Sequence, residues 1–270
     1  MTSPANAETR AASAREWERV GARESASWYL DPLVAAQRRR LHRELVWGWT
    51  PGIDIRRVLK TDSFEEAHGD DGILFDLFPH AYALGMDLAV STARRAQARN
   101  PHARVRFLAS DVRDLAIRPG SMDAIVSTST LDHFDSRAEF ERAIGQLAGA
   151  LRPGGVLVIT LDNPWNPLYG LFRWISRRGW LPFRMGYTLA LPGLTRCLRD
   201  AGLEVTATGG LIHNPRMVST ALFRALRLLL GRRADFAIRA LLAAFAALGR
   251  LPTRRFTACF VAARARKPEA

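Results

Sequence analysis

Acidic side chains recur where strand-like segments of this 270-residue chain end. Asp87 ends the segment AYALGMD, Asp111 follows VRFLAS, and Asp162 lies just past VLVIT. In a sheet of parallel strands, ligands bind at the carboxyl ends of the strands, near the point where the strand order reverses. At such an end a carboxylate can accept hydrogen bonds from both hydroxyls of a ribose. One strand later, a carboxylate can accept from an exocyclic amine such as that of adenine. The spacing therefore predicts a nucleoside site.

The stretch VLKTDSFEEAHGDDG, residues 58–72, places five carboxylates at the expected mouth of this site. Loops that hold a nucleotide at such a position are usually rich in glycine, because backbone N–H groups must approach the ligand closely. Five carboxylates would repel a pyrophosphate but would tolerate a cationic ligand. The alternative to a ligand-binding role for this loop is an ordinary solvated loop. The alternative to a ligand-binding role for Asp87 and Asp111 is that each caps the start of a helix. The loop disfavours a nicotinamide dinucleotide as the ligand.

The elements that must position these acids are short, nearly all-apolar segments that alternate with helical ones. Such strands indicate a parallel sheet covered on both faces, so we expect an α/β doubly wound fold. Ser136 and Glu139 form a capping-box pattern at one helix start. The expected strands are 56–61, 81–87, 105–110, 122–128, 156–160, one after Gly202 and 255–266, and the expected helices include 90–99 and 137–151.

We expect residues 1–50 to form an N-terminal tail with helices, and residues 51–270 to form the main domain with insertions at about 163–187 and 217–252. Residues 1–14 are rich in Ala, Ser and Thr and are expected to fray. A helical pattern then runs to about Val46, interrupted at Asp31-Pro32.

Four segments, in this order and spacing, resemble class I S-adenosylmethionine-dependent methyltransferases: GMDLA at 85–89, FLASDVRDL at 107–115, MDAIVSTSTLDHF at 122–134 and LRPGGVLVIT at 151–160. The resemblance covers roughly residues 56–210, with a last strand near 255–266. It implies a Rossmann-like, seven-stranded, mostly parallel sheet with an antiparallel last strand, and S-adenosylmethionine bound across the ends of the first strands. The residues that it assigns to the cofactor are Asp87 and Leu88 at the ribose, Asp111 and Val112 at the adenine, and Ser127 and Ser129 along the floor.

The first loop departs from the family pattern, which is an acid followed by a glycine-rich run. Lys60 stands where that acid is expected, and Asp62 stands where the first glycine is. S-Adenosylmethionine has no phosphate and carries a sulfonium and an ammonium, so an acidic mouth suits it electrostatically. Our hypothesis places Lys60 at the carboxylate of the cofactor and Asp62 or Glu65 at its amine.

His133 and Asp162 are the candidate catalytic residues. Methyl transfer depends mainly on alignment of the acceptor and exclusion of water, and only some acceptors need a base. His133, just past the fourth strand, is the best-placed base, and the alternative is a histidine that bonds the loop backbone. Asp162 either orients the acceptor or caps its loop. Asn163-Pro164-Trp165, after the fifth strand, is interpreted as turn chemistry.

The net charge of +13 belongs to the C-terminal part of the chain. Residues 1–163 hold 21 Lys+Arg against 22 Asp+Glu, whereas residues 164–270 hold 18 against 4. The aromatic, arginine-rich segment 163–187 is a cover on the core, a lid over an apolar acceptor, or a surface that stacks nucleic-acid bases. The apolar helices in 217–250, parted at Gly231-Arg232-Arg233, are core, a dimer face or an in-plane membrane-surface element, and the first two are favoured.

The sequence predicts a cytoplasmic S-adenosylmethionine-dependent methyltransferase that acts on a small, possibly hydrophobic or lipid-like acceptor, at oxygen by family breadth. Cys197 and Cys259 are isolated, with no metal-ligand spacing. The polar start is not expected to act as a signal peptide, and the most apolar segment, 240–249, is about half a membrane span. The rivals are an RNA methyltransferase, favoured by the basic C-terminal part, and a non-catalytic protein that keeps the cofactor fold. A homodimer and peripheral membrane contact stay open.

Overall fold

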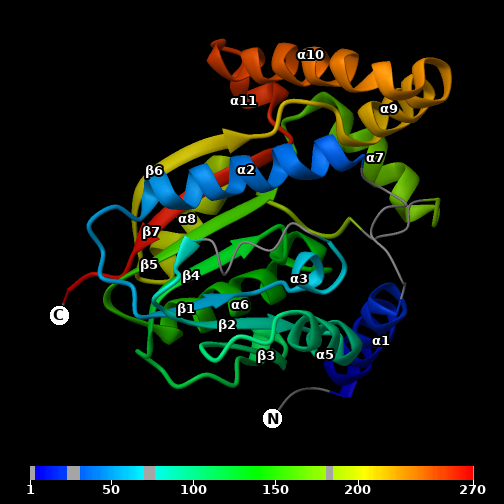
Figure 1. The fold of residues 1–270 in the computed structure, drawn as a ribbon. Coiled ribbons are helices and arrows are strands. Elements are labelled where there is room, and N and C mark those ends of the chain that lie inside the picture. The colour runs from blue at the N-terminus through cyan, green and yellow to red at the C-terminus, as the bar shows by residue number, and fades with distance from the viewer. Residues whose placement is uncertain (1–3, 23–30, 70–76, 181–184, 270) are drawn as a thin grey trace.

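A seven-stranded sheet in the order β3-β2-β1-β4-β5-β7-β6 forms the centre of the molecule (Figure 1). The computed structural model describes residues 4–22, 31–69, 77–180 and 185–269. β7 runs antiparallel to β5 and β6, whereas β1 to β5 pair in parallel. The predicted doubly wound fold with its reversed last strand is therefore confirmed. The strands are β1 (Arg57–Lys60), β2 (Tyr82–Asp87), β3 (Val105–Ala109), β4 (Met122–Thr128), β5 (Leu151–Asp162), β6 (Glu204–Leu211) and β7 (Phe260–Arg266).

The helices fill the connections between the strands. Ser136 caps α6, where its hydroxyl accepts a hydrogen bond from the Glu139 N–H at 3.3 Å, as the capping-box pattern predicts. The α-helices are α1 (Pro4–Gly21), α2 (Pro32–Trp49), α3 (Phe64–His68), α5 (Val90–Arg99), α6 (Arg137–Ala150), α7 (Pro167–Arg177), α8 (Leu191–Asp200), α9 (Arg216–Leu230), α10 (Ala234–Ala247) and α11 (Arg254–Thr257). The 3-10 helices are η1 (Val112–Asp114), η2 (Leu131–His133), η3 (Gly231–Arg233) and η4 (Leu248–Arg250).

Three expected boundaries differ from the structure. The expected frayed tail is helical from Pro4, because proline suits the first position of a helix and the alanines that follow have high helix propensity. The last strand begins at Phe260, since the residues before it form α11. The strand expected at 156–160 is longer, since β5 runs from Leu151 to Asp162, and its pairing with β4 jumps from Leu151 to Val156 across Pro153-Gly154-Gly155.

Alternate side chains of each strand enter two separate cores. On one face of the sheet, Leu59 and Ile125 pack with residues of α6 and α8. On the other face, Val58 and Val126 pack with Val46 of α2. Figure 1 shows α2 lying along this second face. Because both faces are covered, nearly every residue of the central strands is apolar, which is why they could be read from the sequence.

The two insertions leave the sheet at the same end. Asp162 at the end of β5 and Leu211 at the end of β6 both pair with Phe260 at the start of β7. α7 follows β5, and the α9–α10 pair stands between β6 and β7, with its inner face packed on Val34 of α2. Among the helices of the described residues, none is long and apolar enough to cross a membrane.

Candidate functional site

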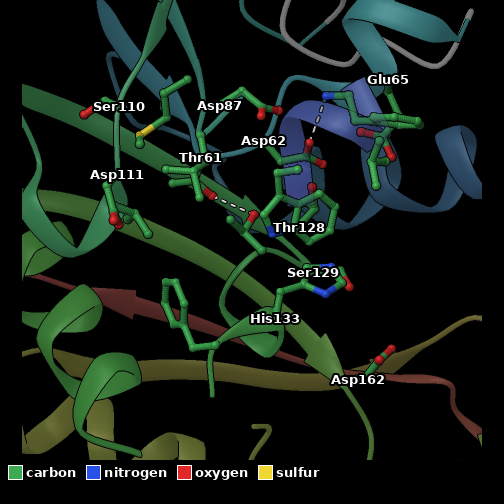
Figure 2. A pocket seen from close by; sticks show the side chains of 18 of the residues that line it. Thr61, Asp62, Glu65, Asp87, Ser110, Asp111, Thr128, Ser129, His133 and Asp162 are labelled. Atoms are coloured by element: carbon green, nitrogen blue, oxygen red, sulfur yellow. Dashed lines mark hydrogen bonds between the residues drawn. The ribbon is translucent and has the colours of Figure 1, made fainter. Parts of the chain in front are cut away.

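A cavity of about 190 Å³ lies at the C-terminal ends of the parallel strands, on both sides of the β1–β4 junction (Figure 2). The strand order reverses at this junction, and open α/β sheets bind their ligands at such a crevice. Helices α1 and α2 also contribute side chains to its lining. The lining comes from α1 (Ser13, Trp17, Val20), α2 (Arg38, Arg39, His42), the β1–α3 connection and α3 (Thr61, Asp62, Phe64, Glu65), the β2 end (Met86, Asp87, Leu88), the β3 end (Ser110, Asp111, Val112), the β4 end (Thr128, Ser129, Thr130, His133, Phe134), and Asp162 and Phe260.

Most of the site residues predicted from the sequence meet in this cavity. Those that line it are Asp62, Glu65, Asp87, Leu88, Asp111, Val112, Ser129, His133 and Asp162. Figure 2 shows Asp62, Glu65 and Asp87 toward one side of the view and Asp162 toward the other. Lys60 and Ser127 do not line it, and the carboxylates Asp70 and Asp71 lie outside the described residues.

Asp87 is held rigidly at the end of β2. Its carboxylate accepts hydrogen bonds from the Ala89 N–H at 2.9 Å and the Ser63 N–H at 3.3 Å. Burial raises the pKa of Asp87 to about 6, against those two hydrogen bonds, which lower it. A carboxylate fixed in this way, with its charge poorly solvated, gains from a ligand that donates hydrogen bonds or carries positive charge.

A second pair of carboxylates faces the same space from the first loop. Asp62 accepts from the Phe64 N–H at 2.8 Å, and burial together with the charge of Glu65 raises its pKa well above the usual value. Burial opposes the charge of Glu65 too, but the guanidinium of Arg38 and the ammonium of Lys60 outweigh it and lower the pKa of Glu65. Arg38 pairs directly with Glu65, so α2 supplies a cation to the mouth of the cavity.

Lys60 has a different environment from the one that the sequence suggested. Its side chain is 1% exposed, and its ammonium bonds Glu66 at 2.8 Å and the carbonyl of Asp62. Burial opposes its charge, but Glu66 and the neighbouring acids raise its pKa. Lys60 therefore neutralises the carboxylates beneath the cavity, whereas Arg38 is the cation that lines it.

Asp111 is oriented by Arg113. The Asp111 carboxylate caps η1 and receives the Arg113 guanidinium through bonds of 2.7 to 3.0 Å. Arg113 is 2% exposed and also pairs with Glu139 of α6. This network ties the end of β3 to α6 and fixes the side of the cavity formed by Ser110 and Val112.

The floor loop after β4 is held by Asp132, which the sequence analysis did not single out. Its carboxylate accepts from the Ser129 hydroxyl at 2.9 Å and the Asp162 N–H at 2.7 Å. Ser129 adopts a positive φ of 51°, an uncommon backbone conformation that such a network can hold. Ser127 is fully buried and accepts from the Thr61 hydroxyl at 3.0 Å, so it supports the floor from below.

His133 lies against an aromatic side chain of the N-terminal helix. Its ring meets Trp17 edge to face, with the ring centroids 4.7 Å apart. Both residues line the cavity, with Phe134 and Phe260 adding apolar surface. One part of the cavity is therefore acidic, and another combines aromatic surface with the imidazole of His133.

Sequence reasoning missed the contribution of α1 and α2. Burial and the charge of Arg38 lower the pKa of His42 to about 4, so this ring is neutral at ordinary pH. Trp17 and Val20 are three residues apart in α1, and Arg38 and His42 are four apart in α2. Each spacing places a pair on one helix face. The spacing could have predicted that each pair shares a helix face. It does not predict which strand end that face covers.

Comparisons with known proteins identify a methyltransferase domain and fold in this chain. Residues 69–159 match the methyltransferase domain family, a range that includes Asp87, Asp111 and His133 but leaves out Lys60, Asp62 and Glu65. An uncharacterized methyltransferase of Mycobacterium tuberculosis is 32% identical over 35% of this chain and 48% of its own length. The demethylmenaquinone methyltransferase of Thermus thermophilus is 36% identical over 46% of this chain and 56% of its own length. The matches thus span about half the length of these relatives.

Among solved structures, the N-methyltransferase NodS from Bradyrhizobium japonicum, in complex with S-adenosylhomocysteine, superposes with a TM-score of 0.57. The superposition covers 95% of this chain and 98% of NodS at 16% identity, a level that speaks to the fold alone. Residues 69–159 carry the sequence of a methyltransferase domain, and the chain has the fold of the class I S-adenosylmethionine-dependent methyltransferases.

Proposed function

We propose that this protein transfers a methyl group from S-adenosylmethionine to an oxygen atom of a small, apolar acceptor. The observation that carries the proposal is the half-buried carboxylate group Asp62, Glu65 and Asp87 at the switch point of a methyltransferase fold. Net negative charge in a sheltered cavity favours a cationic ligand and disfavours a phosphate-bearing one.

The lining residues fit the parts of S-adenosylmethionine one by one. Asp87 would accept from the ribose hydroxyls, and Ser110 to Val112 would surround the adenine. Asp62 and Glu65 would accept from the ammonium, while Arg38 would meet the carboxylate, the role that the sequence had suggested for Lys60. The cofactor supplies an electrophilic methyl group when bound, and the carboxylates stabilise its positive charge.

The acceptor would occupy the part of the cavity near His133. Trp17, Phe134 and Phe260 supply an apolar lining that excludes water and packs a ring or an alkyl chain. A hydroxyl must lose its proton to become a strong nucleophile, and the imidazole of His133 can accept that proton. Asp162, whose N–H is fixed by Asp132, would orient the acceptor. The relative from Thermus, named for demethylmenaquinone, supports an apolar acceptor.

Calorimetric titration with S-adenosylmethionine tests the cofactor half of the proposal. We expect binding by the wild type and a loss of about 100-fold in Asp87→Ala, because charged hydrogen bonds of roughly 1.5–3 kcal/mol are removed. The matched control is Asp54→Ala, an exposed carboxylate paired with Arg56 outside the cavity. Absence of binding by the wild type would favour the non-catalytic alternative and overturn the proposal.

The base is tested by His133→Phe, which keeps a ring against Trp17. With a hydroxylated quinone or phenol as acceptor, we expect kcat to fall by about 100-fold, within the usual range for a general base, while cofactor affinity is unchanged. An unchanged kcat would remove His133 from the chemistry and leave it as part of the lining.

A further inference from the structure

The turn between α9 and α10 exposes large apolar side chains at the far end of a helical pair. We call residues 228–236, LLLGRRADF, the α9–α10 tip. Leu228 is 87% exposed, Leu229 is 80% exposed and Phe236 is 81% exposed. The opposite side of the same pair packs Phe223 and Ile238 against α2, so the helices already have a core-facing side. The tip apolar groups therefore face outward on a well-packed element.

Positive charge surrounds these apolar groups. Residues 216–255 hold nine arginines, no lysine and one acidic residue, Asp235. That acid accepts from Arg227 at 2.8 Å, and Arg227 also pairs with Asp31, so both local carboxylates lie against an arginine of this chain. Arg232 and Arg233 in the tip are exposed. Their charge is available to a partner outside the chain.

The insertion at about 163–187 adds a similar surface at the same end of the sheet. Trp174 and Trp180 near α7 are 48% and 66% exposed, with their ring centroids 5.8 Å apart. The Arg178 guanidinium lies 4.3 Å from the Trp174 ring centroid. α7 follows Asp162, which lines the cavity, and Figure 1 shows α7 and α9 on the same side of the molecule. Tryptophan and arginine together are typical of the boundary between lipid headgroups and acyl chains.

We infer that the α9–α10 tip docks on an anionic phospholipid surface. Leucine and phenylalanine side chains would enter the acyl boundary while Arg232 and Arg233 contact headgroup phosphates, an arrangement that combines apolar burial with electrostatic attraction. A second copy of this chain fits less well, because a two-fold contact would bring the same arginines together. Nucleic acid fits less well too, since the tip offers mainly aliphatic groups where base stacking needs aromatic ones.

The surface also has a place in the reaction, a consequence that rests on the proposed function. The α9–α10 pair and the cavity mouth belong to the same end of the sheet, and α2 packs on the helical pair through Val34 and lines the cavity through Arg38. Docking would hold the mouth near the bilayer, from which an apolar acceptor could enter without crossing water.

Vesicle co-sedimentation of the full chain tests the inference without cofactor or acceptor, so its outcome is independent of the proposed activity. We expect binding to vesicles of phosphatidylcholine with phosphatidylglycerol, weak binding to phosphatidylcholine alone, and loss of binding as salt is raised. Leu228→Ser/Leu229→Ser/Phe236→Ser should lower the partition coefficient by at least about tenfold. Each arginine near the membrane surface contributes about fivefold to the partition coefficient, so Arg232→Glu/Arg233→Glu should lower that coefficient by at least about 25-fold.

Matched variants on other faces provide the controls. Trp47→Ser removes an exposed aromatic from the far end of α2, and Arg57→Glu/Arg94→Glu reverses two exposed arginines of β1 and α5. Both should retain wild-type vesicle binding, and circular dichroism should show all variants folded. The inference is overturned if the wild type does not bind anionic vesicles, or if the tip and control variants bind alike. It is also overturned if the tip substitutions instead cause a dimer to dissociate in sedimentation velocity. A further overturning result is loss of RNA binding in the tip variants when no protein binds the vesicles.

Discussion

Charged side chains have different environments in two regions of the molecule, one around β1 to β3 and the other around β5 to β7. Around β1 to β3, buried or half-buried charged side chains form specific pairs: Lys60 with Glu66, Arg38 with Glu65, and Asp111 with Arg113. Around β5 to β7, the insertions carry most of the excess positive charge of the molecule, much of it on exposed arginines beside exposed leucine and tryptophan side chains.

The difference follows from the cost of removing a charge from water. A buried charge without a partner costs several kcal/mol, and the fully buried Lys60, Glu66 and Arg113 near the cofactor cavity are each paired with an opposite charge. An exposed arginine has no such cost, and its charge stays available to a ligand or surface outside the protein. The first region therefore suits a small charged ligand inside the fold, and the second suits an extended partner outside it.

The largest expected effect comes from breaking the buried pair. Lys60→Met leaves Glu66, whose side chain is fully buried, without its main partner, and should lower the free energy of unfolding by about 3–5 kcal/mol. Urea denaturation measures this, and Lys60→Met/Glu66→Gln should recover much of the loss. Normal stability combined with lost cofactor binding would instead support the sequence hypothesis that Lys60 contacts the cofactor.

A smaller effect is expected at Arg38, which lines the cavity. Arg38→Met should raise the Kd for S-adenosylmethionine by about tenfold or more, because one charged contact to the carboxylate is lost. The control is Arg40→Met, an exposed arginine of the same helix that pairs with Glu44. Decarboxylated S-adenosylmethionine should bind wild type and Arg38→Met with equal affinity, and a tenfold difference for that ligand too would rule out the assigned contact.

The pH dependence of cofactor binding tests the acidic group as a whole. The pKa of Asp87 is raised to about 6 by burial, so Asp87 gains a proton and loses its charge as the pH falls through that value. A cationic ligand then loses a partner, and its affinity should fall by about tenfold between pH 7 and pH 5. Asp87→Asn should bind weakly with a flatter profile. Affinity that rises toward pH 5 would contradict the electrostatic assignment.

Much of the fold could be predicted because its signals are local. Strands such as VLVIT and MDAIVST are apolar on both faces, and the helix 90–99 has the predicted bounds. The prediction that residues 1–14 fray was wrong for the part that forms α1. The abundance of alanine and serine was interpreted as a sign of a frayed terminus, although alanine favours a helix. At the site, strand-end acids such as Asp87 follow from topology, since parallel strands bring their ends together.

The remaining site residues depend on contacts that the sequence does not encode locally. Trp17 reaches His133 across more than a hundred residues, and Arg38 reaches Glu65 from a separate helix. Lys60 was placed at the cofactor by its position alone, whereas its environment is decided by the buried Glu66 of α3. A pattern can thus locate a strand end, but the direction of a charged side chain depends on the partners that packing brings near it.

The smallest expected effect is the one that separates the two regions most sharply. Arg232→Ser/Arg233→Ser should change the free energy of unfolding by less than about 0.5 kcal/mol, because both side chains are exposed in the tip. Urea denaturation of this variant beside Lys60→Met compares the same kind of charge in two environments. A loss above about 1 kcal/mol would mean that the tip arginines support the fold, and the charge would need no external partner to explain it. An unchanged stability means that Arg232 and Arg233 add little to the fold, which is the condition expected of charge that acts on something outside the chain.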